Sequence, residues 1–306
     1  MEAKFLISAH FFVCLLWYGT CFSDVGMDIA RPGIRQRKKR RRIVWVTAAV
    51  IVATSVFLVS RIEVGHRRKY VSLTHGSRAL QLLVDYPSKP RRGSAIVVLV
   101  HEVYGLSEWT KVMSDELADR GFIVLAPDLL SGHGPNGGGY SDFTNENDVI
   151  QAVSDLDPTA VTVDLDAVVD YGKKLPSFDE KLAIVGFSWG GWKSFAFATH
   201  RRDLSGVFVF YGTGPTDVRS ISAPVYGFYA GNDGEVDATI PATTEAMKAA
   251  GKFYDPVVYE GADHGFMRLG VETGNTNPVD KTSRTQALDR LIKLLNAVKA
   301  TNESRH

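Results

Sequence analysis

Apolar residues in the second two-thirds of the chain form short continuous runs. Each run is rich in Val, Ile, Leu or Phe and is followed by turn residues such as Gly, Pro or Asp. Runs of this kind are typical of strands that are buried on both faces of a sheet. The predicted strands are residues 95–100, 122–128, 181–187, 206–212, 224–230 and 256–260.

Segments with helical periodicity lie between these runs. In residues 108–120 apolar side chains recur every three or four positions, with Ser107 as the predicted N-cap and Gly121 as the stop. The other predicted helices are residues 164–175, 190–200, 240–250 and 283–298. Strands that alternate with helices predict an α/β fold, with a mostly parallel central sheet and helices on both faces.

Two further segments flank this pattern. Residues 71–86 predict two short strands around the turn His75-Gly76-Ser77. Residues 131–147 are rich in Gly, Asn and Asp, and predict a long surface loop that could act as a lid.

A separate apolar segment precedes the predicted domain. Residues 43–60 are 18 residues without a charged side chain, and they directly follow the basic run of residues 35–42. A membrane-spanning helix needs about 20 apolar residues, with a lower limit near 17. Residues 1–42 are therefore predicted to be a basic N-terminal leader and residues 43–60 a transmembrane or signal segment. Three alternatives stay open: a signal anchor, a cleaved secretory signal and a buried core helix.

The charges around this apolar segment predict its orientation. Basic residues on its N-terminal side favour a cytoplasmic N-terminus, so the domain is expected outside the cytoplasm, either membrane-anchored (periplasmic or extracellular) or secreted after cleavage. Taken alone, the basic run is also typical of a nucleic-acid-binding patch. Residues 5–22 form a second apolar stretch, which leaves both Met1 and Met27 open as the true start.

Charge and cysteine content separate the leader from the domain. Residues 1–69 hold 13 basic and four acidic residues, whereas residues 70–306 hold 22 basic and 30 acidic ones. A domain with a net charge of −8 lacks the basic footprint that phosphate contacts require, so no nucleic-acid partner is expected. Both cysteines, Cys14 and Cys21, lie in the leader, which excludes a cysteine nucleophile or a disulfide from the domain.

The sequence GFSWGG, residues 186–191, carries the most specific chemical signal. It follows a predicted strand and precedes a predicted helix, which is the setting of a G-x-S-x-G nucleophile elbow. The turn is too tight for the glycine positions on either side of the serine to carry a Cβ, which explains why glycine occurs there. The serine hydroxyl projects from this turn at the N-terminus of the following helix, where the helix dipole stabilises developing negative charge. Ser188 is therefore the predicted nucleophile. The alternative is a glycine-rich turn with an idle serine.

A base and an acid for this serine follow it in chain order. Asp233 lies in the turn after residues 224–230, and His264 lies in the turn after residues 256–260. The carboxyl ends of parallel strands meet at one edge of a sheet, so these side chains are expected together as a Ser, Asp, His triad. The alternatives are a turn-forming role for Asp233, Asp263 as the acid in its place, and a surface imidazole at position 264.

The turn after the first buried strand supplies candidate oxyanion donors. Its sequence is HEVYG, residues 101–105. The backbone N–H groups of Val103 and Trp189 are predicted to stabilise the oxyanion of a tetrahedral intermediate. Glu102 in the same turn is expected to point into the site, and the alternative is a solvated loop carboxylate.

Five motifs resemble those of the dienelactone hydrolase family, which has the α/β-hydrolase fold. In the family's order and spacing they are HEVYGL (101–106), RGFIVLAPDLLSG (120–132), GFSWGG (186–191), AGNDGEVD (230–237) and GADHGFMR (261–268). The resemblance covers about residues 71–298. It implies a dienelactone hydrolase-like α/β-hydrolase domain over residues 70–300.

The resemblance also implies roles for single residues. Ser188 would be the nucleophile, His264 the base and Asp233 the acid that orients it. Glu102 matches the family's active-site glutamate, and Arg268 matches a residue that binds a substrate carboxylate, with a surface arginine as the alternative. The characterised family enzymes carry cysteine at the position of the serine, and their glutamate is tied to that thiol. This departure makes the glutamate auxiliary here and argues against dienelactone itself as the substrate.

These features together predict a serine hydrolase of carboxylic esters or lactones that acts through an acyl-enzyme. The expected partner is a small ester or lactone, and no metal or organic cofactor is expected because no His, Cys or carboxylate cluster has ligand spacing. Two alternatives stay open: a peptidase or thioesterase on the same fold, and a non-catalytic, membrane-tethered binding protein. The oligomeric state is not predicted.

Overall fold

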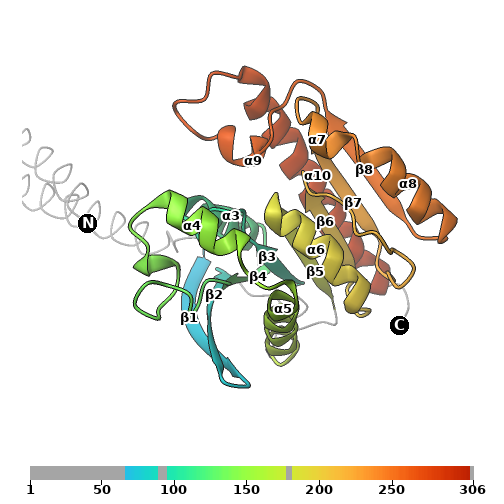
Figure 1. Cartoon of the computed structure of the whole chain (residues 1–306). Helices are drawn as coiled ribbons and strands as arrows, with labels where there is room; N and C mark the ends of the chain where they lie inside the picture. The colour runs from blue at the N-terminus through green and yellow to red at the C-terminus, as the bar shows by residue number, and fades with distance from the viewer. Residues whose placement is uncertain (1–65, 89–94, 177–180, 304–306) are drawn as a thin grey trace, which may run out of the picture. The chain divides into compact units, whose positions relative to one another are not determined.

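The computed structural model describes residues 66–88, 95–176 and 181–303, which contain one eight-stranded sheet (Figure 1). The predicted leader, residues 1–42, and the predicted transmembrane or signal segment, residues 43–60, lie outside the described residues. Within the described ranges, no helix combines the length and the apolar character needed to cross a bilayer.

The sheet has the strand order β1-β2-β4-β3-β5-β6-β7-β8. Its strands are β1 (His66–His75), β2 (Arg78–Pro87), β3 (Ile96–Val100), β4 (Ile123–Asp128), β5 (Leu182–Phe187), β6 (Gly206–Phe210), β7 (Val225–Ala230) and β8 (Tyr254–Tyr259). β2 pairs antiparallel with both β1 and β4, and the other six strands pair in parallel. The predicted mostly parallel sheet is therefore confirmed.

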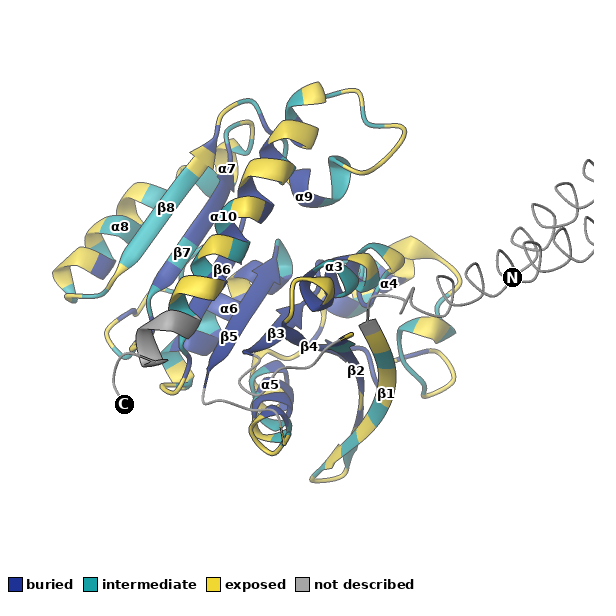
Figure 2. Ribbon diagram, turned by 180° about the vertical axis from the view of Figure 1, so that it is seen from behind, coloured by how far each residue is buried: buried dark blue, intermediate teal, exposed yellow. Residues whose placement is uncertain are grey.

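Helices cover both faces of this sheet, as predicted. They are α3 (Glu108–Asp119), the 3-10 turn η1 (Tyr140–Asp142), α4 (Glu146–Ser154), α5 (Pro158–Lys173), α6 (Trp189–His200), α7 (Gly234–Asp237), α8 (Ile240–Ala249), α9 (Phe266–Leu269) and α10 (Pro278–Glu303). Side chains such as Val98 and Ile184 pack against α4, α5, α6 and α8, whereas their neighbours Val97 and Val185 pack against α3, α9 and α10. This alternation buries the central strands on both faces (Figure 2).

Element boundaries differ from the sequence prediction mainly at helix starts. The predicted helix 164–175 begins at Pro158, where the Asp157 side chain accepts a hydrogen bond of 2.8 Å from the Ala160 N–H. Proline suits the first helical position because its missing N–H has no acceptor there. The predicted helix 283–298 likewise begins at a proline, Pro278.

The hairpin of β1 and β2 is longer than the two short strands predicted. Ten residues of each strand pair, from His66 opposite Pro87 to His75 opposite Arg78. Gly76 forms the turn with φ of 56°, a left-handed conformation that favours glycine.

The segment predicted as a surface loop, residues 131–147, is tied to the sheet. The Asp128 carboxylate at the end of β4 accepts hydrogen bonds from the backbone N–H groups of Leu130 at 3.1 Å and Tyr140 at 2.8 Å. Burial raises the pKa of Asp128, and these two donors oppose the rise. The segment contains η1 and leads into α4, which the sequence analysis did not predict.

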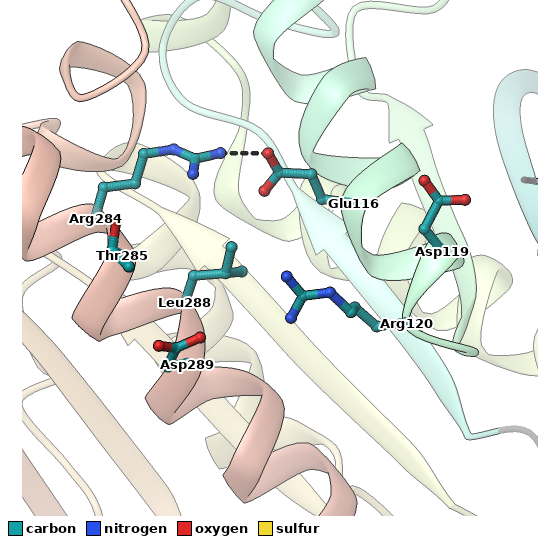
Figure 3. A pocket seen from close by; sticks show the side chains of 7 residues that line it. All are labelled: Glu116, Asp119, Arg120, Arg284, Thr285, Leu288 and Asp289. Carbon is teal, nitrogen blue, oxygen red and sulfur yellow. Dashed lines mark hydrogen bonds and ion pairs between the residues drawn. The ribbon is translucent and has the colours of Figure 1, made fainter.

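A second set of contacts fixes α9 against α3 and α10. The Met267 carbonyl accepts from Arg284 Nε at 3.1 Å and from Trp109 Nε1 at 3.3 Å. The same Arg284 forms an ion pair with Glu116 across a pocket of about 360 Å³ between α3 and α10 (Figure 3). The lining of this pocket includes none of the predicted site residues, and its ion pair acts as a brace between the two helices.

Candidate active site

The three predicted triad residues lie in the turns that follow parallel strands, at the carboxyl edge of the sheet. Ser188 stands between β5 and α6, Asp233 follows β7 and caps α7, and His264 stands between β8 and α9. The strands β5, β6, β7 and β8 are consecutive neighbours. The sheet thereby brings together three side chains that are distant in the sequence.

Ser188 occupies a strained backbone conformation that its surroundings enforce. Its φ is 54° and its ψ is −117°, and its N–H donates to the Phe210 carbonyl at 2.9 Å. A Cβ on Gly186 would lie 2.1 Å from the Gly190 carbonyl oxygen, and one on Gly190 would lie 2.3 Å from the His101 carbonyl oxygen. Neither position has room for a side chain, as the nucleophile elbow predicts.

The triad side chains form a continuous chain of contacts. Ser188 Oγ lies 2.8 Å from His264 Nε2, and His264 Nδ1 contacts Asp233 Oδ2. The His264 side chain is 45% exposed, whereas that of Asp233 is 11% exposed. The imidazole is therefore open to solvent, while its carboxylate partner is sheltered.

The alternative acid, Asp263, points elsewhere. Its carboxylate accepts a hydrogen bond of 2.7 Å from Asn232 Nδ2, and its N–H donates to Asp280 Oδ1 at 2.8 Å. These contacts join the turns after β7 and β8. Asp263 thus holds the turn in place, and the structure puts Asp233 beside the histidine.

The two predicted oxyanion donors lie in turns that leave neighbouring strands. Trp189 is the first residue of α6, where an N–H has no acceptor within its helix. Val103 lies in the turn after β3, which pairs with β5 so that Val100 is opposite Gly186. Among the described residues, neither of the two N–H groups donates a hydrogen bond. Both are available at the edge where Ser188 lies.

Glu102 is buried and bound on both carboxylate oxygens. Its side chain is 3% exposed; Tyr211 Oη donates to Oε1 at 3.2 Å and Arg268 Nε donates to Oε2 at 3.1 Å. Burial raises the pKa of Glu102, and the Arg268 charge opposes the rise. The alternative of a solvated carboxylate is therefore wrong. These contacts connect Glu102 to the elements that surround His264.

Arg268 is surrounded by partners rather than free at the surface. Besides Glu102, its guanidinium contacts Glu272 and lies 4.6 Å from the centre of the Tyr104 ring. Its side chain is 22% exposed. Binding of a substrate carboxylate by Arg268 stays a prediction, and the structure shows a guanidinium that already faces two carboxylates.

Sequence reasoning missed Tyr211, which lies directly after β6. It is fully buried with φ of 38°, and its ring centre lies 5.0 Å from that of His264. Burial and the Glu102 charge raise the pKa of Tyr211, so its hydroxyl remains a neutral donor. The available signal was a polar-tipped aromatic residue at the end of a predicted strand.

Sequence reasoning also missed His101. This fully buried imidazole stacks on Trp189 with ring centres 5.6 Å apart, and its Nδ1 donates to the Glu102 carbonyl at 2.7 Å. Burial lowers the pKa of His101 to about 4. The residue therefore supports the oxyanion turn as a neutral, apolar-facing ring.

The part of the chain that the structure describes holds no group of three or more His, Cys, Asp or Glu residues able to bind a metal ion. The site consists instead of a hydroxyl, an imidazole and a carboxylate in hydrogen-bond contact. This set of groups can move a proton from the hydroxyl to the imidazole, which suits acyl transfer.

Comparison with known proteins identifies the relatives of this chain. The dienelactone hydrolase family matches it over residues 81–299. A putative carboxymethylenebutenolidase from Methylorubrum extorquens is 33% identical over 198 residues, which cover 59% of this chain and 67% of that protein. A mouse carboxymethylenebutenolidase homolog is 25% identical over 244 residues, covering 76% of this chain and 95% of its own.

Solved structures share the same fold. A putative dienelactone hydrolase from Klebsiella pneumoniae superposes with a TM-score of 0.65 at 22% identity, covering 76% of this chain and 98% of that one. A dienelactone hydrolase-like promiscuous phosphotriesterase from metagenomic libraries gives 0.64 at 21% identity, covering 76% and 99%. These likenesses confirm the predicted α/β-hydrolase fold.

The family match includes every residue of the predicted site, from Glu102 to Arg268. It confirms, at the level of the family, the prediction of a hydrolase of esters or lactones. The chain belongs to the dienelactone hydrolase family.

Proposed function

We propose that this chain is a serine hydrolase of carboxylic esters or lactones that acts through an acyl-enzyme. The observation that carries the proposal is the 2.8 Å contact between Ser188 Oγ and His264 Nε2, with Asp233 on the other ring nitrogen. A serine hydroxyl is a weak nucleophile unless a base lies within hydrogen-bond reach. His264 meets that requirement.

The triad residues divide the proton transfers between them. His264 accepts the proton of Ser188 as Oγ attacks the carbonyl carbon, and Asp233 stabilises the imidazolium that results. His264 then returns the proton to the leaving oxygen, which breaks the bond to the alcohol and leaves the acyl group on Ser188. Water, deprotonated by the same imidazole, releases the acid and restores the serine.

The two backbone donors supply electrostatic stabilisation. The carbonyl oxygen becomes negative in the tetrahedral intermediate, and the N–H groups of Val103 and Trp189 are the proposed donors to it. A donor of this kind contributes about 2.7–4 kcal/mol to transition-state stabilisation. Glu102 acts through other residues: with Tyr211 and Arg268 it supports the turn that carries His264.

Replacement of the nucleophile tests this proposal. In the full chain, Ser188→Ala should lower kcat for short-chain nitrophenyl esters by a factor on the order of 10⁴–10⁶ and abolish labelling by a fluorophosphonate probe. Ser194→Ala is the matched control, because it removes a buried hydroxyl on α6, the helix that Ser188 precedes, and this hydroxyl has no hydrogen-bond partner among the described residues. Turnover that survives Ser188→Ala would contradict the proposal, whereas Ser194→Ala should keep the turnover of the parent chain.

The same full chain distinguishes the other acyl-transfer reactions. An ester, a thioester and an anilide that share one acyl group differ only in the leaving group, so their kcat/KM values rank the three chemistries directly. Faster turnover of the anilide or the thioester would reassign the chain as a peptidase or a thioesterase. A folded chain that binds esters without turning over any of them, or reacting with the probe, would be a binding protein.

We propose in addition that residues 43–60 hold the hydrolase domain outside the cytoplasm. The support is an uncharged run of 18 residues after the basic residues 35–42. With tags at both ends of the full chain, protease added to intact cells should remove the C-terminal tag, and the chain should stay in membranes after carbonate extraction. Loss of the N-terminal tag with a soluble exported domain would identify a cleaved signal. A full chain recovered from the cytosol would overturn the proposal.

A further inference from the structure

The first turn of α10 supplies a buried carboxylate to the turn that carries His264. Asp280 is fully buried, and its Oδ1 accepts a hydrogen bond of 2.8 Å from the N–H of Asp263, the residue before His264. Its Oδ2 accepts another, also of 2.8 Å, from Asn275 Nδ2. The helices α7 and α9 and the start of α10 lie at the same end of the sheet (Figures 1 and 2), so these contacts join α10 to the edge that carries the triad.

The N-terminus of α10 is capped by other side chains. Asn277 Oδ1 accepts a hydrogen bond of 3.1 Å from the Val279 N–H, as a capping residue does. The third residue of a helix often binds the N–H of its capping residue, but here the Asn277 N–H donates to Asn275 Oδ1 at 3.1 Å. The two asparagines thus satisfy the helix end, and the Asp280 carboxylate binds the turn after β8 instead.

A buried carboxylate is costly unless donors bind its oxygens. Both oxygens of Asp280 have a donor, and the N-terminus of α10 stabilises negative charge in its first turn. A charged acceptor forms a hydrogen bond about twice as strong as a neutral acceptor does. The Asp263 N–H is therefore held more firmly than a neutral side chain would hold it.

The same turn is also held from the side of Asp233. Asn232 Nδ2 donates to Asp263 Oδ1 at 2.7 Å and to the Gly261 carbonyl at 3.0 Å. Asn232 directly precedes Asp233, and Asp263 directly precedes His264. The contact between the aspartate and the histidine of the triad is thus accompanied by a second bridge, one residue earlier in each turn.

We propose that Asp280 is a positioning residue for His264 and acts through the Asp263 N–H. The imidazole must reach Ser188 with one nitrogen and Asp233 with the other. Because its side chain is 45% exposed, side-chain packing holds it on one side only, and the backbone of the turn must fix its place. A displacement of about 1 Å can lower a catalysed rate about 100-fold. The inference rests on the proposed ester hydrolysis.

Removal of the buried acceptor tests this role. In the full chain, Asp280→Ala should lower kcat for nitrophenyl acetate about 10- to 100-fold, with KM within about threefold, because His264 serves acylation and deacylation alike. Asp280→Asn keeps an oxygen for the Asp263 N–H without the charge, and should lose only about three- to tenfold. Folded Asp280→Ala with the kcat of the parent chain would overturn the proposal.

The pH profile distinguishes positioning from a general loss of structure. Asp233 stabilises the imidazolium of His264, and a misplaced ring would lose part of that stabilisation. The acidic limb of kcat/KM should therefore move to lower pH in Asp280→Ala. The ionisable groups around the ring, which the substitution leaves in place, are Asp233, Glu102, Tyr211 and Arg268. A lower kcat with an unmoved acidic limb would overturn the proposal.

A second carboxylate on α10 provides the matched control. Asp289 is exposed, so Asp289→Ala should leave kcat and the pH profile unchanged. A similar loss in this variant would assign the effect to the charge of the helix and overturn the positioning role. If Asp280→Ala does not fold, Asp280→Asn decides the question, and parental values of kcat and of the acidic limb in that variant would overturn the proposal.

These outcomes separate the inference from the proposed function. If the fluorophosphonate labels Ser188 and esters are hydrolysed, but the Asp280 variants behave like the parent chain, ester hydrolysis stands and the inference fails. If Ser188 is not labelled and no ester reacts in the folded parent chain, the proposed function fails and the inference fails with it.

Discussion

The turns after β3 and β8 each carry a histidine at the same edge of the sheet, and the two side chains have opposite surroundings. His264 is 45% exposed, with Ser188 on one nitrogen and Asp233 on the other. His101 is fully buried; one nitrogen donates to the Glu102 carbonyl, and Nε2 has no partner in the described part of the chain.

The two environments suit different roles: His264 can transfer protons, whereas His101 has a structural role. A general base must gain and lose a proton in each cycle, which requires a partner for the charged form and access to the substrate. Asp233 and solvent provide both for His264. Burial without a counter-charge lowers the pKa of His101 to about 4, so this ring remains neutral at neutral pH.

The largest expected effect comes from exchanging each histidine for glutamine. His264→Gln should lower kcat by a factor on the order of 10⁴–10⁶, because no other side chain in the described ranges contacts Ser188 Oγ to accept its proton. His101→Gln keeps a donor for the Glu102 carbonyl and should leave kcat within about tenfold. Steady-state kinetics with one nitrophenyl ester measures both. Equal losses in the two folded variants would mean that His101 takes part in the chemistry.

Substitutions of the two aspartates near His264, Asp233 and Asp263, should likewise have one large and one small effect on kcat. Asp233→Asn should lower kcat by about 10⁴-fold because an amide cannot stabilise the imidazolium and favours the wrong tautomer; this magnitude is the one known for the corresponding substitution in chymotrypsin-type enzymes. Asp263→Asn keeps an acceptor for Asn232 and should change kcat by no more than a few-fold. A larger loss for Asp263→Asn, measured with the same ester, would return the acid role to it.

The smallest expected effect is on stability at acidic pH. The native state keeps His101 neutral down to about pH 4, whereas the unfolded chain binds a proton below about pH 6.5. The free energy of unfolding should therefore fall as pH falls from about 6.5 to 4, by up to about 3 kcal/mol from this residue.

The matched variant isolates that contribution. Urea unfolding of His101→Gln should show a flatter dependence on pH than the parent chain, because the other titrating groups are the same in both. Parallel pH dependences would show that the buried imidazole accepts its proton in the folded protein.

The sequence predicts best those elements that are determined by residues close together in the chain, such as single strands, tight turns and helix starts. The apolar run of β5 and the glycines beside Ser188 placed the nucleophile elbow correctly, because strand burial and backbone crowding both leave marks in the sequence. The start of α5 also carried such a mark in Asp157 and Pro158, and a search for N-caps would have found it.

The rest of the site depends on contacts between distant segments. Chain order favoured Asp233 over Asp263 as the acid, but the contact itself depends on how the turns after β7 and β8 are arranged. That arrangement puts the Asp233 carboxylate on His264 and the Asp263 carboxylate on Asn232. Tyr211 and Glu102 are 109 positions apart, and their hydrogen bond exists because the sheet places β6 close to β3. No periodic pattern in the sequence indicates that Tyr211 and Glu102 are in contact.

The backbone of Ser188 has a consequence for how this gene tolerates mutation. A non-glycine residue at φ of 54° and ψ of −117° costs on the order of 1–3 kcal/mol. Glycine at position 188 would relieve that strain, so a copy of the gene freed from selection for turnover could lose its nucleophile and gain abundance. Gly186 and Gly190 have no such freedom, since a methyl group at either would strike a carbonyl oxygen. In a descendant that has lost activity, we therefore expect Gly186 and Gly190 to be retained after Ser188 has been replaced.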